Sequence, residues 1–406
     1  MTFRPDDVRA ANLPPAVVLQ LDCMTGLQTA RILARKGVRV IGVVEDPTHY
    51  ACKSRLVSCV VQGDPSQLVD TLNGIAGSVD GPCFVVPCSD RYVTTLIAGR
   101  SEISKAMRFV QPDAELARML MDKARFAEFA EGAGIPIPFT RLVNREVTLD
   151  PGSLQFPVVV KPALRTPGWD AEMGGKVVVV EDEDELDRVV GRGLRMCDEL
   201  IVQEWVRGGD DQLISFNGYF DRSGALRASF TARKVRQWPP SAGTSASGEE
   251  VRADDTLDLA IRLFTEIGYR GLAYLETKRD PATGTPKVIE PNIGRPTGRS
   301  AIAEAGGVEL VYTAYRDALD LEPLAPTTQR YEGVKWVYLR HDVQSALAAI
   351  RNGTLTVREW IRSLRGRKAY AVWAPDDPAP FLWDLWDAAR RTVQRFQRRL
   401  RRSADR

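Results

Sequence analysis

The stretch Leu272-Ala-Tyr-Leu-Glu276 is followed, after residues 280–285, by Lys287-Val-Ile-Glu290-Pro-Asn292. Leu272, Tyr274 and Glu276 alternate with other residues at a period of two, which is typical of a β-strand. The connecting sequence, Asp-Pro-Ala-Thr-Gly-Thr, has the composition of a turn, so the two segments are predicted to pair as a hairpin. On such a hairpin Glu276, Glu290 and Asn292 would converge on one face.

Two carboxylates and a carboxamide on one face suggest a metal site. Oxygen ligands without His or Cys suit a hard cation such as Mg2+, which keeps several waters and bridges substrate phosphates. The alternative is a hairpin face that is simply solvated, and this segment alone supports both interpretations equally. The rest of the chain has to decide between them.

The composition indicates a folded protein with little material for histidine or cysteine chemistry. The chain has 406 residues, of which 44% are hydrophobic and 8% aromatic, enough for two or three domains with apolar cores. It contains two histidines, His49 and His341, and six cysteines without a Cys-x-x-Cys pair. These features argue against a Ser-His-Asp centre, a zinc site and a disulfide framework. Catalysis is therefore expected to use carboxylates, lysines, arginines and a metal ion.

Targeting signals are not evident, and charge is unevenly distributed. No run of eighteen or more apolar residues occurs, and residues 1–15 carry acids and prolines where a secretory peptide needs a basic start and an apolar core. The expected location is the cytoplasm.

Residues 390–406 hold eight Arg and one Asp, so the other residues carry 47 basic and 52 acidic groups despite the overall charge of +2. The C-terminal end is therefore a separate basic unit.

Residues 1–111 are predicted to form a small doubly wound α/β domain. Two buried strands, 16–21 and 38–44, flank a helical pattern at 25–36, and further strands and helices alternate up to residue 99. The loop after the first strand contains the single glycine Gly26, whereas a dinucleotide-binding turn needs Gly-x-Gly-x-x-Gly. Binding of NAD in this domain is therefore not expected.

The next region has the layout of a flexible flap. A strand over residues 156–162 contains Lys161 and leads, through a loop with Gly168, Gly174 and Gly175, into another strand. Such a loop can place backbone N–H groups over phosphates, with the lysine as a point charge. It lacks the Walker P-loop pattern and is not expected to open a helix. An ordinary hairpin loop is the alternative interpretation.

Two further segments could bind parts of a nucleotide or another anion. The strand 200–206 ends at a glycine turn, where backbone groups could bind an adenine edge and an acid beyond the turn could hold ribose hydroxyls. Arg233, Lys234 and Arg236 precede a loop rich in Ser and Gly. An anionic partner would bind at this cluster, although a solvated cationic strand edge explains it equally well.

Taken in order, these parts resemble the ATP-grasp superfamily. The order is an α/β domain, Asp122-Lys123, the strand with Lys161, a glycine flap, Gln203-Glu204-Trp205-Val206, Glu276 and Glu290-x-Asn292. Within the superfamily the chain is similar to carboxylate–amine ligases of the D-aspartate ligase type. It is more distantly similar to biotin carboxylase and the carbamoyl-phosphate synthase large subunit. The resemblance covers about residues 16–325.

The resemblance implies an N-terminal pre-ATP-grasp domain followed by two α+β lobes that clamp a nucleotide. The central lobe is expected at 112–200, with residues 166–176 as the closing flap, and the C-terminal lobe with the metal site at 201–325. By this resemblance, Lys123 and Lys161 bind the phosphates under a flap that contains Gly168, Gly174 and Gly175. The adenine is contacted by Gln203, Glu204, Trp205 and Val206, and the ribose by Asp211. The resemblance assigns Mg2+ to Glu276, Glu290 and Asn292.

The activity that the resemblance implies is ATP-dependent joining of a small-molecule carboxylate to an amine through an acyl phosphate, with Mg2+ or Mn2+ as cofactor. Lys234, Arg236 and Arg295 are candidates for holding the acceptor carboxylate or the transferring phosphoryl group. Many members have Glu-x-Asn-x-Arg, whereas Arg295 falls one residue later. A bulge at the extra glycine, Gly294, would restore the reach of this arginine.

Two alternatives differ in class from this function. One is an ATP-dependent carboxylase-like member, against which no biotinyl segment or second synthetase half is visible. The other is a catalytically silent nucleotide-binding or scaffold protein, and the intact set of lysines and acids argues against it. The sequence does not identify the carboxylate or the amine. No nucleic-acid partner is expected. A homodimer is expected only because homodimers are the commonest soluble oligomers.

Residues 326–380 are interpreted as an appended segment, and residues 381–406 are predicted to form a basic amphipathic helix. Apolar residues recur there at steps of three or four, at Trp386, Ala389, Val393, Phe396 and Leu400. The helix could pack on the body with its arginines in solvent, or lie on an anionic membrane at its inner face. An RNA-binding arm is a third, weaker interpretation.

Overall fold

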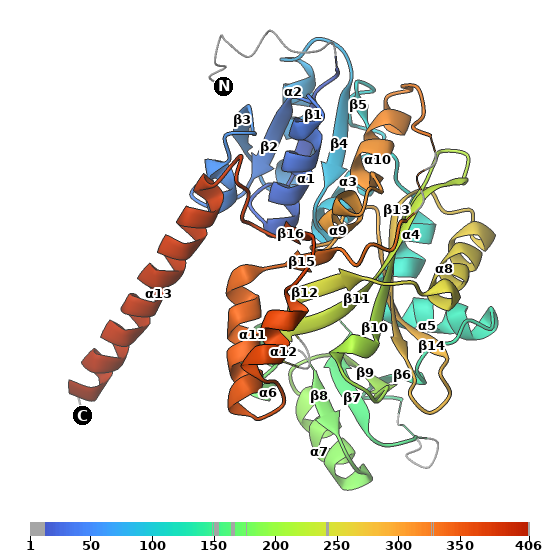
Figure 1. Ribbon diagram of the computed structural model, residues 1–406. Helices are drawn as coiled ribbons and strands as arrows, with labels where there is room; N and C mark the ends of the chain where they lie inside the picture. The colour runs from blue at the N-terminus through green and yellow to red at the C-terminus, as the bar shows by residue number, and fades with distance from the viewer. Residues whose placement is uncertain are drawn as a thin grey trace.

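The computed structural model describes residues 13–147, 149, 154–163, 167–175, 177–240, 243–325, 327 and 329–404 (Figure 1). Within these residues the strands form three sheets. The mixed α/β class predicted from the sequence is confirmed. The three sheets together surround the region that contains most of the predicted site residues.

The N-terminal sheet is parallel and has the strand order β3-β2-β1-β4-β5. Its order reverses between β1 and β4, and the loops after these two strands lie at the same edge of the sheet. Its elements are β1 (Ala16–Leu19), α1 (Met24–Arg35), β2 (Val40–Val44), β3 (Cys59–Gln62), α2 (Leu68–Ala76), β4 (Cys83–Pro87), α3 (Asp90–Ala98) and β5 (Met107–Arg108). Strands and helices alternate along this domain because buried runs of Val and Ile are separated by amphipathic helices.

A small antiparallel sheet forms the second lobe, with the order β6-β9-β7-β8. Its elements are β6 (Thr140–Asn144), β7 (Val158–Pro162), α6 (Pro167–Met173), β8 (Val178–Val180), α7 (Glu183–Gly193) and β9 (Glu199–Glu204). The expectation that the glycine loop opens no helix is wrong, because α6 lies between β7 and β8. Trp169 on α6 is fully buried among the apolar side chains of this lobe, and this burial anchors the helix.

The large sheet has the order β14-β13-β10-β11-β12-β15-β16. Its strands are β10 (Leu213–Phe220), β11 (Leu226–Trp238), β12 (Thr244–Glu250), β13 (Gly271–Arg279), β14 (Pro286–Ile293), β15 (Lys335–Val337) and β16 (Lys368–Tyr370). The helices α4 (Ala114–Met121), α5 (Lys123–Gly132), α8 (Asp254–Glu266), α9 (Ala301–Ala305) and α10 (Leu310–Ala318) accompany it. Phe216, Phe220 and Phe264 form a buried aromatic cluster between the sheet and α8.

The N-terminal and large sheets share one hydrophobic core. Phe84 on β4 meets Tyr315 on α10 edge to face, with ring centroids 5.7 Å apart. Trp336 on β15 is fully buried, and its indole N–H donates to the Gln28 side chain on α1 at 2.9 Å. This shared core holds the N-terminal sheet against the large sheet and its helices.

The segment after residue 326, which was predicted as an appended segment, packs on the body. β15 and β16 extend the large sheet beside β12, and α11 (Leu339–Arg351) and α12 (Val357–Ser363) pack near β11. Trp336 alone contributes a large apolar surface to the common core. Asp377 adds a buried ion pair with Arg31 on α1, at 2.9 Å.

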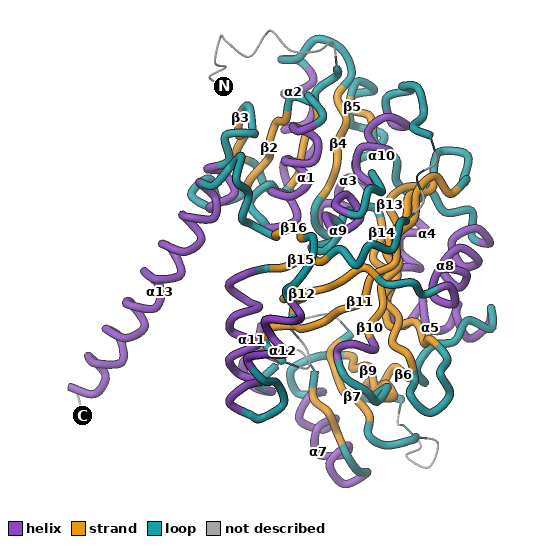
Figure 2. The backbone as a smooth tube through the Cα atoms, in the orientation of Figure 1, coloured by secondary structure: helices purple, strands orange, loops and turns teal. Residues whose placement is uncertain are grey.

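The last helix, α13 (Ala379–Ala404), leaves the body as a single long helix (Figure 2). Its first turns contact the short helical turn Tyr50–Lys53, where the Lys53 ammonium lies 4.9 Å from the ring centre of Trp383. Asp384 is buried and pairs with Arg340 at 3.2 Å. No helix in the described ranges combines the length and the apolar character that crossing a membrane requires.

Candidate active site

A cleft of about 960 Å³ lies where the small lobe, the large sheet and the N-terminal sheet meet. This volume is in the upper range of small-molecule sites. Eleven of the residues predicted from the sequence line it: Lys123, Lys161, Gln203, Glu204, Trp205, Val206, Lys234, Glu276, Glu290, Asn292 and Arg295. Residues that are far apart in the chain are therefore brought to one cavity by the fold.

The hairpin β13–β14 has the register that brings the acidic residues together. Glu276 lies opposite Glu290, and Tyr274 lies opposite Asn292 in the antiparallel pairing. Directly opposed residues share a face of the sheet, with Cβ atoms about 5 Å apart. The two carboxylates and the carboxamide consequently point to one side of the hairpin, into the cleft.

Glu276 is held by three neighbours. Its Oε1 accepts from Lys234 Nζ at 3.0 Å, its Oε2 accepts from the Tyr274 hydroxyl at 3.1 Å, and Arg299 approaches Oε2 at 3.7 Å. Burial alone would raise the pKa of this carboxyl, but the charges of Lys234 and Arg299 outweigh it and hold the pKa below its usual value. Glu276 is therefore an ionised carboxylate at neutral pH.

The donor set fits a hard divalent cation. Two carboxylates and one amide oxygen are the ligand types that Mg2+ selects, whereas Zn2+ prefers nitrogen or sulfur. No group of three or more His, Cys, Asp or Glu side chains that could hold a metal occurs in the part of the chain that the structure describes. Glu276, Glu290 and Asn292 would supply three ligands from the protein. Phosphate oxygens and waters would have to complete the shell, as Mg2+ commonly requires.

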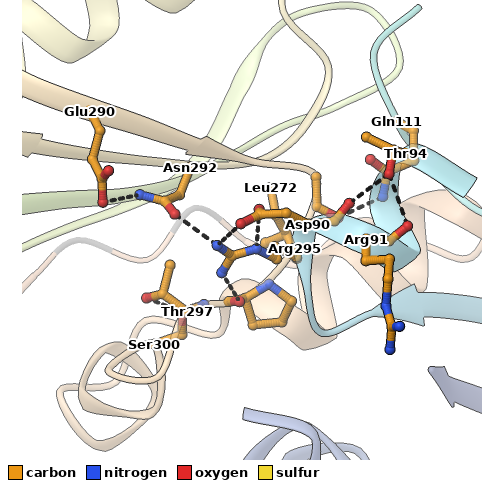
Figure 3. A network of polar contacts seen from close by, with 12 residues as sticks. Asp90, Arg91, Thr94, Gln111, Leu272, Glu290, Asn292, Arg295, Thr297 and Ser300 are labelled. Carbon is orange, nitrogen blue, oxygen red and sulfur yellow. Dashed lines mark hydrogen bonds and ion pairs between the residues drawn. The ribbon is translucent and has the colours of Figure 1, made fainter. Parts of the chain in front are cut away.

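A chain of polar contacts runs from Glu290 into the N-terminal domain (Figure 3). Asn292 Nδ2 donates to Glu290 Oε1 at 3.4 Å, and Asn292 Oδ1 accepts from Arg295 Nη2 at 2.7 Å. Arg295 then grips Asp90 with two bonds, Nε to Oδ1 at 2.7 Å and Nη2 to Oδ2 at 3.1 Å. The shifted arginine therefore reaches Asn292 in spite of the extra residue.

Gly294 explains how that reach is achieved. Its φ is +69°, a left-handed conformation that strongly favours glycine. Its carbonyl accepts from Gln111 Nε2 at 2.6 Å, and a Cβ at this position would lie 2.0 Å from Gln111 Oε1. The turn at Gly294 thus redirects the chain after β14 and brings Arg295 back to the hairpin face.

Lys161 lies at the small-lobe side of the cleft. Its Nζ donates to Gln203 Oε1 at 2.9 Å, and Gln203 in turn donates to Thr140 Oγ1 at 2.8 Å. Burial, and then the nearby charge of Lys123, lower the pKa of Lys161 to about 8, against an opposing effect of Glu290. Because burial and Lys123 disfavour the charged form of Lys161, an anion that enters the cleft would stabilise this cation.

The end of β9 forms another wall. The Glu204 carboxylate accepts from Lys287 Nζ at 2.7 and 2.9 Å, and Lys278 Nζ lies 4.6 Å from the ring centre of Trp205. Beyond the glycine turn, Asp210 lines the cleft and accepts from Gln237 Nε2 at 2.7 Å. Burial raises the pKa of Asp210. Asp211, the acid assigned to the ribose by resemblance, is exposed and is not among the described residues lining the cleft.

Arg236 lies apart from the other proposed catalytic residues. The pairing of β11 with β12 shifts register on both sides of Arg236, so that Lys234 and Gln237 face the cleft. Arg236 faces the C-terminal helices instead, where its Nε donates to Asp342 Oδ1 at 2.7 Å and its Nη1 to Ser363 Oγ at 2.8 Å. A strict period of two along this strand would have placed Lys234 and Arg236 on the same face.

The flap glycines also lie outside the cleft lining in the described residues. Gly168 is on α6, and Gly174 has a φ of +77°. Residues 164–166 and 176, which belong to the predicted loop and flap, lie outside the described residues. The role of this segment in covering phosphates remains a prediction.

Several cleft residues were not identified from the sequence. Tyr274, Lys278 and Arg299 contact predicted residues, and the period of two in β13 could have pointed to the first two. Asp90 pairs with a residue 205 positions away, a contact that no local pattern signals.

Two lobes enclose the cleft, and a parallel α/β sheet precedes them in the chain. This arrangement defines the class of protein: the chain has the ATP-grasp fold. No protein-family model matches the chain. It is similar to D-aspartate ligase from Enterococcus faecium (strain Aus0004), with 26% identity over 261 residues. The aligned part is 60% of this chain and 61% of that protein, so the chain spans less than two thirds of this relative.

Solved structures of several enzymes have a similar fold. An N5-carboxyaminoimidazole ribonucleotide synthetase in complex with ADP aligns with a TM-score of 0.63 and 15% identity, over 85% of this chain and 87% of that one. The biotin carboxylase domain of 2-oxoglutarate carboxylase from Hydrogenobacter thermophilus, with MgADP, ADP and bicarbonate, has a TM-score of 0.60 and 15% identity, over 79% and 72%. At these identities the likeness shows the fold.

Proposed function

We propose that the chain is an ADP-forming ligase that uses ATP and Mg2+ to join a carboxylate to an amine. The observation that carries the proposal is the hairpin face of Glu276, Glu290 and Asn292 lining the same cleft as Lys161. Acidic ligands for a cation and a half-buried lysine in one cavity suit a polyphosphate bound with its metal. The similarity to a D-aspartate ligase supports an amine as the second substrate.

In this proposal each wall of the cleft binds a different part of ATP. The segment Gln203–Val206 binds the adenine, and Lys161 and Lys123 bind the phosphates. Asp210 is our candidate for the ribose, because it lines the cleft and Asp211 does not. The metal, Mg2+ or Mn2+, neutralises phosphate charge and is held by Glu276, Glu290 and Asn292.

The chemistry needs charge neutralisation more than acid–base catalysis. The substrate carboxylate attacks the γ-phosphorus, its oxygen forms a new P–O bond, and the bond to the ADP oxygen breaks. The amine then attacks the acyl carbon, phosphate leaves with that oxygen, and the nitrogen loses a proton. Arg295 and Lys234 are our candidates for holding the anionic groups in these steps, because both line the cleft. A cleft between lobes excludes water, which would hydrolyse the acyl phosphate.

Two other functions compete with this proposal. A carboxylase-like enzyme would take bicarbonate in place of an organic carboxylate, as the biotin carboxylase domain with the same fold does in its crystal structure. A silent nucleotide-binding protein would keep the cleft without turnover, but the ionised Glu276 and the complete ligand set favour an active centre.

The decisive experiment measures ADP and phosphate release from ATP and Mg2+ with panels of carboxylates and amines. Hydroxylamine is included to trap an acyl phosphate as a hydroxamate, and products are identified by mass spectrometry. We expect release that requires both substrates and a product with one new amide bond. ADP release with bicarbonate alone would favour the carboxylase, and tight ATP binding without turnover on any pair would favour the silent protein.

We also propose that α13 contacts an anionic membrane surface. Leu382, Trp383 and Trp386 are 59%, 42% and 53% exposed near the start of the helix. Seven arginines follow on the same helix in residues 390–404, so aromatic and basic residues belong to one extended element. Such helices bind at lipid interfaces through buried apolar side chains and attraction to anionic headgroups.

Vesicle co-sedimentation of the full chain tests this second proposal. We expect sedimentation with vesicles of phosphatidylcholine and phosphatidylglycerol, little with phosphatidylcholine alone, and loss at high salt. The variant with Leu382→Ser and Trp386→Ser keeps the Asp384–Arg340 pair, so its body should fold normally. Equal sedimentation of this variant and the wild type would contradict the proposal.

A further inference from the structure

Lys278 is a buried cation of the cleft to which the proposed function gives no role. It lies on β13 two residues after Glu276, so the two side chains are on the same face of the strand. Lys278 is only 7% exposed, and it lines the cleft. Among the described residues no carboxylate pairs with its ammonium and no acceptor receives a hydrogen bond from it. Because buried lysines are rare unless they are paired, the missing acceptor is expected to come with a ligand.

The contact that holds Lys278 in place is aromatic. Its Nζ lies 4.6 Å from the ring centre of Trp205, at the end of the segment that follows β9. The face of an indole ring attracts an ammonium, but it is a weak acceptor and satisfies only part of the three N–H donors. The other donors of Lys278 are therefore free to bind a group that enters the cleft.

An acidic turn lies beside Lys278. In the pairing of β10 with β13, Lys278 is opposite Leu213, which directly follows the turn Asp210–Gln212. Asp210 lines the cleft, and its Oδ1 accepts from Gln237 Nε2 at 2.7 Å. The ammonium of Lys278 and the carboxylate of Asp210 are thus neighbours on one wall of the cleft, although the two groups do not form an ion pair with each other.

These two neighbours define the chemistry of the group that fits between them. A carboxylate only accepts hydrogen bonds and an ammonium only donates them, so the ligand has to offer a donor to Asp210 and an acceptor to Lys278. A phosphate would suit Lys278 but would be repelled by Asp210. Two adjacent hydroxyl groups meet both requirements, because each hydroxyl can donate and accept.

We propose that Lys278 and Asp210 together bind the two ribose hydroxyls, so that the cleft distinguishes ribonucleotides from deoxyribonucleotides. The inference rests on the proposed function, because it takes Gln203–Val206 as the wall that binds adenine. Lys278 contacts Trp205 of this wall, and the sugar is attached directly to the base. Lys278 donates to one hydroxyl oxygen, and the neighbouring hydroxyl donates to Asp210. A nucleotide without one of these hydroxyls leaves a charged group unpaired.

The chain offers a matched control on the same strand. Arg279, the next residue of β13, points to the opposite face, where it pairs with Asp255 at 2.6 Å. Arg279 is not among the described residues that line the cleft. The variant Arg279→Met therefore removes a positive charge at almost the same position without changing the cleft. The variant Lys278→Met keeps an apolar side chain against Trp205 and should fold, which thermal unfolding checks.

The test measures the affinity of the full chain for ATP, 2′-deoxyATP and 3′-deoxyATP by titration calorimetry with Mg2+. We expect the wild type and Arg279→Met to bind at least one deoxynucleotide about tenfold or more weakly than ATP, the effect of a hydrogen bond to a charged group. Lys278→Met should bind ATP about tenfold more weakly and should bind that deoxynucleotide as well as it binds ATP. Lys161→Met should weaken binding of all three nucleotides by the same factor, because they carry the same phosphates.

Three results would overturn the inference alone. The first is a wild-type protein that binds ATP and both deoxynucleotides equally well. The second is a folded Lys278→Met variant that prefers ATP as strongly as the wild type does. The third is the same loss of preference in Arg279→Met, which would indicate a general effect of charge. A wild-type protein that binds none of the three nucleotides would instead refute the proposed function, so the wild-type titration separates the two failures.

Discussion

The depressed pKa of Lys161 predicts that nucleotide binding takes up protons. Burial and the charge of Lys123 lower this pKa from 10.5 to about 8, so roughly half of the Lys161 side chains are neutral at pH 8. Phosphates that bind beside the ammonium would raise the pKa again, by opposite charge. At pH 8 we expect binding of ATP to take up roughly half a proton per site, and close to none at pH 6.5 by this group.

Titration calorimetry measures this uptake directly. Binding enthalpies of ATP at pH 8 are compared in two buffers with different ionisation enthalpies, and the slope gives the number of protons. The variant Lys161→Met keeps a similar side-chain length without a charge and should show almost no uptake and weaker binding. Equal uptake by the variant and the wild type would refute the assignment of Lys161 to the phosphates.

The same shift has a consequence for the stability of the ligand-free protein. The pKa of Lys161 is lower in the folded than in the unfolded state, so the unfolded chain binds more protons between pH 8 and 10.5. The destabilising effect of the Lys161 charge on the folded protein is therefore fully present below pH 8, and it disappears as the pH rises to about 10.5. A shift of this size corresponds to at most about 3 kcal/mol. Lys161→Met should accordingly stabilise the ligand-free protein at pH 7 in denaturant unfolding.

Three further predictions concern other residues. Glu290→Gln should leave thermal unfolding unchanged but abolish Mg2+-dependent ADP release, because a metal ligand loses its charge; activity near the wild-type level would contradict the metal assignment. Arg236→Met should destabilise the fold by about 3 kcal/mol in denaturant unfolding, because it leaves the buried Asp342 without its cation, while nucleotide affinity stays the same. Weaker nucleotide binding without loss of stability would instead place Arg236 in the active centre. Asp210→Asn should weaken ATP binding more than Asp211→Asn, and the reverse order in a calorimetric comparison would restore the assignment made by resemblance.

Local patterns predicted the parts of the site that depend on regular strands. The alternation along residues 272–276 and the turn after them predicted a hairpin, and Glu276 and Glu290 lie directly opposite each other on it. A hairpin needs only strand periodicity and turn chemistry, which are properties of the local sequence. The strands that carry Lys161 and Gln203 were also predicted, but their pairing and the contact between the two side chains depend on the tertiary fold.

The sequence did not predict features that depend on an irregular strand or on a contact between residues far apart in the chain. One extra residue in β11 turns Arg236 away from Lys234, and a bulge of this kind has no strong local signature. The helix α6 depends on the burial of Trp169 in a core that only the tertiary fold creates. The Asp90–Arg295 pair joins two domains, so its partners could not be matched from one sequence.

If the substrate carboxylate becomes an acyl phosphate, one of its oxygens must pass to the released phosphate. Once the substrate panel has identified a carboxylate, it is labelled with 18O and incubated with ATP, Mg2+, the amine and the full chain. Mass spectrometry then determines the label in the released phosphate. We expect ADP as the nucleotide product and one 18O atom in each phosphate formed. Phosphate without label, or label in AMP, would contradict the acyl-phosphate mechanism.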